Sequence, residues 1–254
     1  MLVKDKVAVI TGGASGIGRE TSLKYAREGA KVVVADFNEV GGTETVNLIK
    51  KEGGEAVFYK VDVTKYDEVE KLVEFTVDTY KTIDVMFNNA GIGGAGVVNN
   101  QDLELYHKVI NVNQHGVTYG IMAASKKMIE LGVKGVIINT ASVFGYMASV
   151  GTFAYHATKG AVVMMTKSAA LDLAPYGIRV VAIAPGFVET PIVETYKKMG
   201  IEDKLKALQM GKEYIQPEQI ADVVCLLATK EARMVNGSVV MVDDGFASFK
   251  SHLG

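Results

Sequence analysis

The sequence predicts a doubly wound α/β fold, in which helices cover both faces of a parallel sheet. Seven short runs rich in valine and isoleucine recur along the chain, and their apolar residues do not alternate with polar ones. Strands that are buried on both faces of a parallel sheet have this composition. Segments with helical periodicity separate the runs, for example residues 20–30 and 65–80. Strand alternating with helix indicates a three-layer arrangement.

The expected strands are, in chain order, residues 7–11, 31–36, 56–63, 84–91, 135–142, 179–186 and 238–245. No Pro- or Ser-rich linker, repeat or low-complexity tract divides the sequence, so residues 1–254 are expected to form a single domain. Residues 191–211 depart from the strand–helix rhythm and directly follow a strand end. They would overlie the carboxyl edge of the sheet, where ligands of open α/β sheets bind. We interpret them as a substrate-binding lid segment, although a surface helix explains them equally well.

The composition excludes several classes of function. The chain is 48% hydrophobic and 22% charged, as is usual for a soluble globular enzyme. Its net charge of −2 gives no electrostatic reason to expect nucleic acid or an anionic membrane as a partner. The N-terminus lacks the pattern of a secretory signal, and no apolar run approaches the roughly 18 residues of a membrane span. The single cysteine, Cys225, fits a cytoplasmic location. Metal-ligand spacing is absent from the four histidines, so no metal is expected; they are His107, His115, His156 and His252.

A glycine cluster follows the first expected strand and precedes a helix. Gly12, Gly16 and Gly18 allow a tight turn and let the backbone approach a pyrophosphate at the helix N-terminus. Asp36 ends the second run 18 residues after Gly18 (36 − 18), near the distance expected of a carboxylate that binds a ribose 2′-hydroxyl. The alternative is that Asp36 only begins a loop. A carboxylate here would repel a 2′-phosphate, and residues 12–15 and 37–38 carry no basic side chain, so NAD is favoured over NADP.

Tyr155 and Lys159 are four residues apart, so on a helix their side chains share one face. A surface coincidence would explain the pair. An ammonium group beside a phenol would instead favour the phenolate and lower the tyrosine pKa from about 10. His156 points about 100° away from Tyr155 on such a helix, and we interpret it as a structural or rim residue.

Several motifs together resemble the short-chain dehydrogenase/reductase family. They are Thr11 with the three glycines, the "NNAG" of residues 88–91, and Ser142, Tyr155 and Lys159, and they occur in the family's order from about Lys6 to Gly245. The resemblance implies a single Rossmann-like domain with a seven-stranded parallel sheet of order 3-2-1-4-5-6-7.

The resemblance also implies a set of cofactor contacts. Asp62 and Val63 would flank the adenine, Pro185 and Gly186 would line the nicotinamide, and Val188 would contact its carboxamide with Thr190. The full expected set is Thr11, Gly12, Ser15, Gly16, Ile17, Gly18, Asp36, Phe37, Asp62, Val63, Asn89, Ala90, Gly91, Tyr155, Lys159, Pro185, Gly186, Val188 and Thr190.

The same resemblance assigns chemistry to four residues. Tyr155 would exchange a proton with the substrate oxygen, Lys159 would lower the tyrosine pKa and hold the ribose, and Ser142 would stabilise charge on the substrate oxygen. The family adds an asparagine that holds a water joining the lysine to solvent. Asn111 and Asn113 both qualify; we favour Asn113, because Gly116 follows it at the family's spacing of three residues.

The residues expected near the substrate are mostly apolar, which favours a secondary alcohol or ketone with a hydrocarbon part. The main candidates are Ser142, Phe144, Met147, Tyr155 and Phe187, with Val143, Tyr146, Val150, Ile192, Val193 and Tyr196 as further ones. Members of the family are often homotetramers. Phe246 and Phe249 near the C-terminus would need covering in a monomer, so we expect a homotetramer.

Three functions fit these residues. The first is an NAD-dependent oxidoreductase that transfers a hydride between nicotinamide and the carbon of a secondary alcohol or ketone. The second is an NADPH-dependent 3-oxoacyl carrier-protein reductase, which Asp36 argues against. The third is a non-catalytic protein that senses NAD or acts as a scaffold. A protein of that kind would be expected to lose a catalytic group, whereas this sequence keeps all four.

Overall fold

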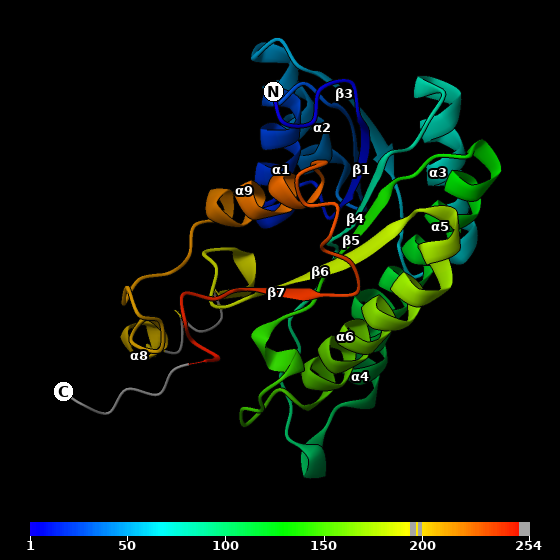
Figure 1. The fold of residues 1–254 in the computed structure, drawn as a ribbon. Coiled ribbons are helices and arrows are strands. Elements are labelled where there is room, and N and C mark those ends of the chain that lie inside the picture. Colours follow the sequence, from blue (N-terminus) through cyan, green and yellow to red (C-terminus); the bar gives the residue numbers. More distant parts are fainter. Residues whose placement is uncertain (194–196, 198–199, 249–254) are drawn as a thin grey trace.

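A computed structural model describes residues 1–193, 197 and 200–248 of the chain. They contain one seven-stranded parallel sheet of order β3-β2-β1-β4-β5-β6-β7, which confirms the predicted strand number and order (Figure 1). The strands are β1 (Val7–Thr11), β2 (Lys31–Asp36), β3 (Glu55–Lys60), β4 (Val85–Asn88), β5 (Val136–Thr140), β6 (Arg179–Pro185) and β7 (Val239–Val242).

The central strands are buried as their sequences predict, whereas the two edge strands are not. Every residue of β1, β4 and β5 is buried, but most residues of β3 and β7 keep some exposure. The expectation of burial on both faces is therefore wrong at the sheet edges, where fewer elements pack over the strands. β3 also ends at Lys60, so residues 61–63 belong to the loop that follows it and not to the sheet.

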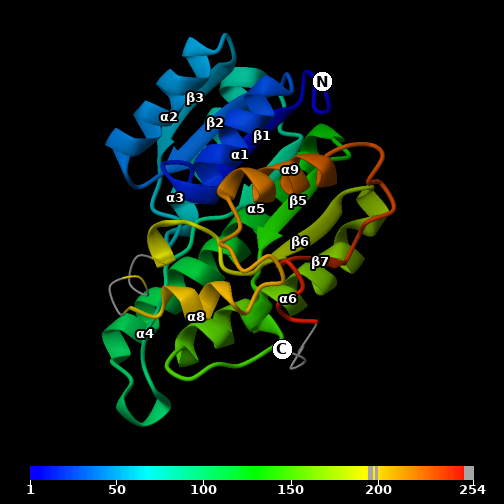
Figure 2. The same ribbon diagram turned by 90° about the vertical axis from the view of Figure 1, so that its left-hand side faces the viewer.

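Helices cover both faces of the sheet (Figures 1 and 2). On one face lie α1, α2 and α9, whose apolar side chains meet alternate strand residues such as Ala8 and Ile10. On the other face lie α3, α5 and α6, which pack against Val9 and its equivalents. The described helices are α1 (Gly16–Arg27), α2 (Glu39–Lys51), α3 (Tyr66–Tyr80), α4 (Leu103–Ile110), α5 (Gly116–Leu131), α6 (Phe153–Leu173), α8 (Glu202–Lys206) and α9 (Pro217–Leu227).

A buried polar chain joins the centre of the sheet to α6. Asn88 Nδ2 donates to Asn139 Oδ1 at 2.9 Å, and Asn139 Nδ2 donates to Thr166 Oγ1 at 3.0 Å. All three residues are almost completely buried, where satisfied hydrogen bonds are stronger than in water. They fix β4, β5 and α6 relative to one another, and α6 is the helix that carries Tyr155 and Lys159.

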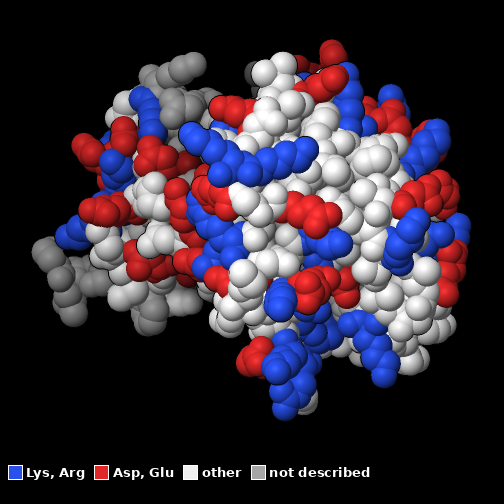
Figure 3. Space-filling view, turned by 90° about the horizontal axis from the view of Figure 1, so that it is seen from above, with Lys and Arg blue, Asp and Glu red and all other residues white. Residues whose placement is uncertain are grey.

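Because all seven strands are parallel, their carboxyl ends meet at one edge of the sheet, where residues 191–211 also begin. Within those residues, η5 (Pro191–Val193) and α8 are described. Acidic and basic side chains are interspersed on the face seen in Figure 3. Among the described residues, no helix has the length and apolar character that crossing a bilayer would require.

Candidate active site

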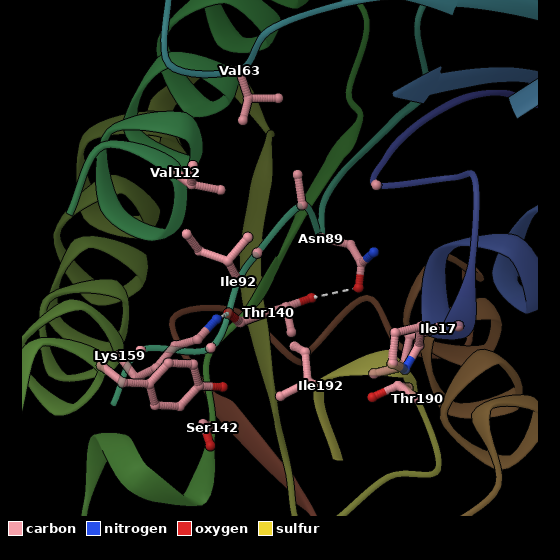
Figure 4. A pocket seen from close by; sticks show the side chains of 18 of the residues that line it. Ile17, Val63, Asn89, Ile92, Val112, Thr140, Ser142, Lys159, Thr190 and Ile192 are labelled. Atoms are coloured by element: carbon pink, nitrogen blue, oxygen red, sulfur yellow. Dashed lines mark hydrogen bonds between the residues drawn. The ribbon is translucent and has the colours of Figure 1, made fainter. Parts of the chain in front are cut away.

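A cavity of about 1090 Å³ opens along the carboxyl edge of the sheet. Its walls come from the loops after β1 to β6, from α4 and from the first turn of α6. Figure 4 shows side chains from these distant segments converging on one space. The position agrees with the rule that ligands of open α/β sheets bind outside the carboxyl ends of the strands.

The glycine loop after β1 requires glycine at each predicted position. Gly12 and Gly16 have φ of +68° and +51°, a conformation that side chains with a Cβ rarely adopt. A Cβ on Gly18 would lie 2.1 Å from the Gly12 carbonyl oxygen, so α1 could not pack this closely on the loop. Ser15, Gly16 and Ile17 line the cavity at the start of α1. Within the described residues, the Ser15 side chain does not cap this helix, so its N-terminus faces the cavity without a side-chain partner.

Thr11, at the end of β1, holds the loop after β4 in place and does not line the cavity. It is 3% exposed, and its Oγ1 accepts the backbone N–H groups of Asn89 at 3.0 Å and Ala90 at 3.1 Å. Asn89 Nδ2 donates to the Thr11 carbonyl at 3.1 Å, and its Oδ1 accepts from Thr140 Oγ1 at 3.4 Å (Figure 4). We therefore correct the expected cofactor contact of Thr11: its hydroxyl ties β1 to β4. Gly18 likewise acts through packing.

Asp36 reaches the cavity from the end of β2, as the sequence predicts. Its Oδ2 accepts the N–H of Ala14 at 2.9 Å, and its Oδ1 accepts that of Asn38 at 2.8 Å. Charge-assisted bonds of this kind are short and orient a carboxylate. The neighbouring Phe37 also lines the cavity, with its ring 69% exposed.

Arg19, which follows the glycine motif, was not considered in the sequence analysis. Its Nη2 donates to the Ala14 carbonyl at 2.8 Å and to Glu44 Oε2 at 2.7 Å. This guanidinium therefore braces the glycine loop against α2. Its charge is paired with Glu44 beside the Asp36 site.

Beyond Asp36, two valine side chains line the cavity. Val63 follows β3 and Val112 lies before α5, and their side chains point into the same part of the cavity (Figure 4). Asp62 also lines this part, with its Oδ1 held by the Thr64 hydroxyl at 2.7 Å. The sequence analysis expected Asp62 and Val63 here but had no signal for Val112.

Asn113 lies in a π-helical turn, Asn111–His115, between α4 and α5. It is fully buried, and its amide exchanges two hydrogen bonds of 2.8 Å with the backbone of Ile92. Single π-helical turns frequently occur at functional sites. Asn113 therefore fixes the loop after Gly91, and its contact with a water stays a prediction. Asn111, the other candidate, lines the cavity.

Ser142, Tyr155 and Lys159 all line the same part of the cavity. The Lys159 ammonium is 3% exposed, donates to the Thr140 carbonyl at 2.7 Å and lies 5.5 Å from the centroid of the Tyr155 ring. Burial lowers the pKa of Lys159 from 10.5 to about 8, because desolvation disfavours the charged form. Ser142 Oγ accepts the N–H of Phe144 at 3.2 Å, which orients its hydroxyl. Figure 4 shows Ser142 and Lys159 facing this space, with Ile192 across it.

The expected substrate residues divide into two groups. Phe144, Phe187, Ile192 and Val193 line the cavity, in addition to Ser142 and Tyr155. The others do not: Val143 is 1% exposed, Met147 is partly buried against the cluster that includes Phe187 and Phe246, and Tyr146 and Val150 are 47% and 93% exposed. We therefore correct the expected direct contact of Met147. Tyr196 lies outside the described residues.

Two further features bear on the substrate end. His156 Nε2 accepts the N–H of Ser149 at 3.0 Å, which agrees with its interpretation as a structural residue. One face of α4 also borders the cavity, and the sequence analysis missed it because its residues carry no motif; they are Glu104, His107 and Lys108.

Known proteins resemble this chain over most of its length. A family model described as enoyl-(acyl carrier protein) reductase matches residues 12–247. A 3-oxoacyl-[acyl-carrier-protein] reductase of Thermotoga maritima is 37% identical over 96% of this chain and 99% of its own. Glucose 1-dehydrogenase 2 of Bacillus subtilis is 35% identical over 98% of this chain and 97% of its own. The crystal structure of a short-chain type dehydrogenase/reductase from Mycobacterium marinum superposes with a TM-score of 0.94, at 30% identity, and covers 97% of both chains.

Proposed function

This chain belongs to the short-chain dehydrogenase/reductase family and is an oxidoreductase of alcohols or ketones; we propose that it is an NAD-dependent dehydrogenase of secondary alcohols that also reduces the matching ketones. One observation carries the proposal. The Ser142 hydroxyl, the Tyr155 phenol and the buried Lys159 ammonium border one cavity, whose other end presents Asp36 and the start of α1.

The cavity fits a nicotinamide dinucleotide. The glycine loop and the N-terminus of α1 would hold the pyrophosphate, Asp36 the adenosine ribose, and Val63 and Val112 the adenine. Lys159 would hold the second ribose, with Pro185, Gly186, Val188 and Thr190 around the nicotinamide; all four line the cavity. When bound, the cofactor supplies the hydride acceptor or donor.

Side chains of the protein transfer the proton of the substrate hydroxyl. In the oxidation of an alcohol, Tyr155 would accept the hydroxyl proton as a general base, and in ketone reduction it would return it. The Lys159 ammonium nearby favours the phenolate that this step requires. Ser142 would donate its hydroxyl to the substrate oxygen, where charge develops. Phe144 and Phe187 exclude water from one wall.

Three observations favour NAD over NADP. The Asp36 carboxylate is held in place by two backbone N–H groups and would repel a 2′-phosphate. Arg19 is paired with Glu44. Lys60, which lies beside Asp36 in the sheet register, has its Nζ 3.4 Å from Glu39. The two nearby cations thus face other carboxylates.

The two alternative functions each meet an opposing feature. The Thermotoga maritima relative supports a 3-oxoacyl carrier-protein reductase, but Asp36 opposes the NADPH of that hypothesis. A non-catalytic NAD-binding protein would have no need of an ammonium buried at 3% exposure beside Tyr155. Keeping a charge there costs stability, so its retention supports catalysis.

We keep three further proposals from the sequence. Residues 1–254 act as one domain with 191–211 as a lid, since Pro191, Ile192 and Val193 line the cavity. The protein works in the cytoplasm, which suits the buried thiol of Cys225. It assembles as a homotetramer, since large apolar side chains of α5 and α6 are exposed, including Met122 at 50%, Met164 at 61% and Leu171 at 77%.

The role expected for Phe246 in assembly is wrong. Phe246 is only 8% exposed in the isolated chain, because Phe144 and Phe187 of the same chain cover its ring. Phe249 lies outside the described residues. The tetramer proposal therefore rests on α5 and α6, and light scattering that finds only a 27.2 kDa species would reject it.

The test of the proposed function is an assay of initial rates at fixed pH, in which absorbance at 340 nm reports reduced cofactor. NAD and NADP are each combined with secondary alcohols, diols, hydroxysteroids and sugars. We expect turnover of at least one alcohol with NAD, at a kcat/KM well above that with NADP. Faster turnover with NADPH and a 3-oxoacyl thioester would favour the reductase. Calorimetric binding of NAD without turnover of any substrate would favour the sensor.

A further inference from the structure

We propose that Phe246, from the turn after β7, is a positioning residue that sets the size of the substrate pocket. Phe246 does not line the cavity itself, but it supports the two phenylalanines that do. It therefore limits how large a hydrocarbon ring fits beside Ser142 and Tyr155. This inference rests on the proposed function, since it concerns the alcohol or ketone bound in that site.

Three phenylalanines from distant segments form one cluster. The ring of Phe144 meets those of Phe187 at 5.9 Å and Phe246 at 6.2 Å between centroids, both edge to face. Phe187 and Phe246 are 5.3 Å apart. Phe144 also lies 6.4 Å from the Tyr155 ring. Because Phe144 and Phe187 form the cavity wall, Phe246 occupies the layer directly behind it.

The turn that carries Phe246 is closely fixed. The carboxylate of Asp243, a residue 6% exposed, accepts the N–H of Gly245 at 3.2 Å and that of Ala247 at 2.7 Å. Gly245 has a φ of +75°, which glycine adopts without strain. Asp243 thus holds the backbone on both sides of Phe246 and aims its ring at the wall.

The same turn is tied to the end of the proposed lid. Asp244 Oδ2 accepts the N–H of Gly211 at 2.6 Å, and the Asp244 carbonyl accepts that of Met210 at 3.0 Å. The amide of Gln209, a residue 2% exposed, accepts the N–H of Phe187 at 2.8 Å and donates to the carbonyl of Glu213. The Asp244 and Gln209 side chains and one backbone hydrogen bond therefore connect the turn of Phe246, the backbone of Phe187 and the end of the lid.

A buried phenylalanine that only supports others can still control specificity. Its removal leaves a cavity behind the wall, into which Phe144 and Phe187 can move. An apolar pocket discriminates by about 10- to 200-fold for each methylene that fits badly. Because the displaced wall would accept extra methylenes, we expect a truncated Phe246 to favour larger rings by about tenfold.

The test measures ketone binding without turnover. In the Tyr155→Phe background with NADH bound, calorimetry gives Kd for cyclopentanone and cyclooctanone. Phe246→Ala is compared with Phe246→Leu and with Phe75→Ala. Phe75, on α3, is a suitable control because it is not among the residues that line the cavity. Its ring packs on that of Tyr59 on β3, with 4.8 Å between the ring centroids. The Kd of NADH is measured for each variant to verify that the cofactor site is intact.

We expect Phe246→Ala to lower the Kd of cyclooctanone relative to cyclopentanone by about tenfold, with Phe246→Leu close to the parent and Phe75→Ala unchanged. An unchanged ratio in Phe246→Ala with intact NADH binding would overturn the inference, as would failure of both ketones to bind any variant. If Phe246→Ala cannot bind NADH, Phe246→Val decides by the same ratio, since valine keeps an apolar side chain in the cluster but removes most of the volume of the ring. Turnover by the wild-type enzyme, measured separately, tests the proposed function and not this inference.

Discussion

The two ends of the cavity differ in whether backbone groups or side chains form their walls. The part of the cofactor end expected to hold the pyrophosphate and the adenosine ribose is mostly backbone: a glycine loop, the first turn of α1 and a carboxylate held by two N–H groups, all within residues 11–38. The substrate end is mostly side chains, and they come from distant segments: Phe144, Phe187, Ile192 and, behind them, Phe246. Between the ends lie Tyr155 and Lys159 on one turn of α6.

This difference indicates what each end can vary. A backbone cradle tolerates little change, because a single Cβ would collide with the loop. A wall of apolar side chains can change its shape through residues that never touch the substrate. Substitutions at the cofactor end should therefore alter binding of the dinucleotide, and those at the substrate end should alter turnover and selectivity.

Apart from the loss of Tyr155 or Lys159, the largest effect on turnover should come from Ser142, a group that acts only in the transition state. We expect Ser142→Ala to lower kcat by about 10²- to 10³-fold, because a donor to the developing oxyanion is lost. The Kd of NAD should stay the same. Steady-state kinetics and calorimetry measure both, and Ser125→Ala is the control, since Ser125 lies within α5 and its Oγ donates to the Met122 carbonyl at 3.2 Å. A Ser142→Ala enzyme with normal kcat would remove Ser142 from the chemistry.

Asp36→Ser should change the selectivity between NAD and NADP at the cofactor end. The variant loses a charged partner for the ribose of NAD, and it no longer repels the 2′-phosphate of NADP. We therefore expect the NAD/NADP ratio of kcat/KM to fall by about 10²-fold, or about 3 kcal/mol. The rate at saturating NAD should change little. Asp67→Ser, on the exposed side of α3, serves as the control. If the ratio does not move, Asp36 does not select the cofactor.

Gly18→Ala tests the backbone cradle itself. The new Cβ would lie 2.1 Å from the Gly12 carbonyl, so α1 or the loop must shift, at a cost of about 1–3 kcal/mol in stability. NAD binding should weaken together with stability. Gly53→Ala makes a useful comparison, since Gly53 has φ +82° but nothing within 4 Å of the added atom. That variant should lose stability through strain alone and keep its affinity for NAD.

Lys159→Met should produce the smallest change in stability, and one of opposite sign to that of Gly18→Ala. Burial lowers the Lys159 pKa from 10.5 to about 8, so below pH 8 the fold carries a charge at a cost of about 3 kcal/mol. Loss of the bond to Thr140 offsets about 1–2 kcal/mol of the gain from removing that charge. We expect the variant to be about 1 kcal/mol more stable at pH 7 and inactive.

The sign of this effect should depend on pH. Between pH 8 and 10.5 the unfolded state binds more protons at Lys159 than the folded state, so wild-type stability gains from rising pH. The advantage of Lys159→Met should therefore shrink and then reverse across this interval, since the neutral wild-type amine keeps the bond to Thr140 that the variant lacks. Urea denaturation of both proteins at pH 7 and pH 10 measures it. A constant difference would mean that Lys159 is not desolvated as its burial indicates.

Much of the fold and of the cofactor end could be predicted from the sequence, for a physical reason. A parallel sheet buries its strands in short apolar runs, and β1 and β2 begin and end where those runs do. The glycine loop needs glycine at particular positions, so its pattern is local and visible. The edge strands depart from the expected burial because burial depends on what packs above them.

The rest of the site depends on contacts that sequence does not encode locally. Val112 and Gln209 have no motif, and their positions follow only from the folded loops. Phe246 was interpreted as a residue of an assembly interface, since an apolar side chain near the C-terminus gives no sign of what covers it. Met147 and Tyr146 follow Ser142 closely in the sequence, but neither lines the cavity.

The most direct test of the proposal that Tyr155 carries out the proton transfer, while the cofactor end binds NAD independently, uses Tyr155→Phe. With saturating NAD and an alcohol that the wild-type enzyme oxidises, absorbance at 340 nm is recorded while calorimetry gives the Kd of NAD. We predict that the variant binds NAD as the wild type does and forms NADH at least about 10³-fold more slowly, because the general base is lost. Undiminished NADH formation by Tyr155→Phe would contradict the account.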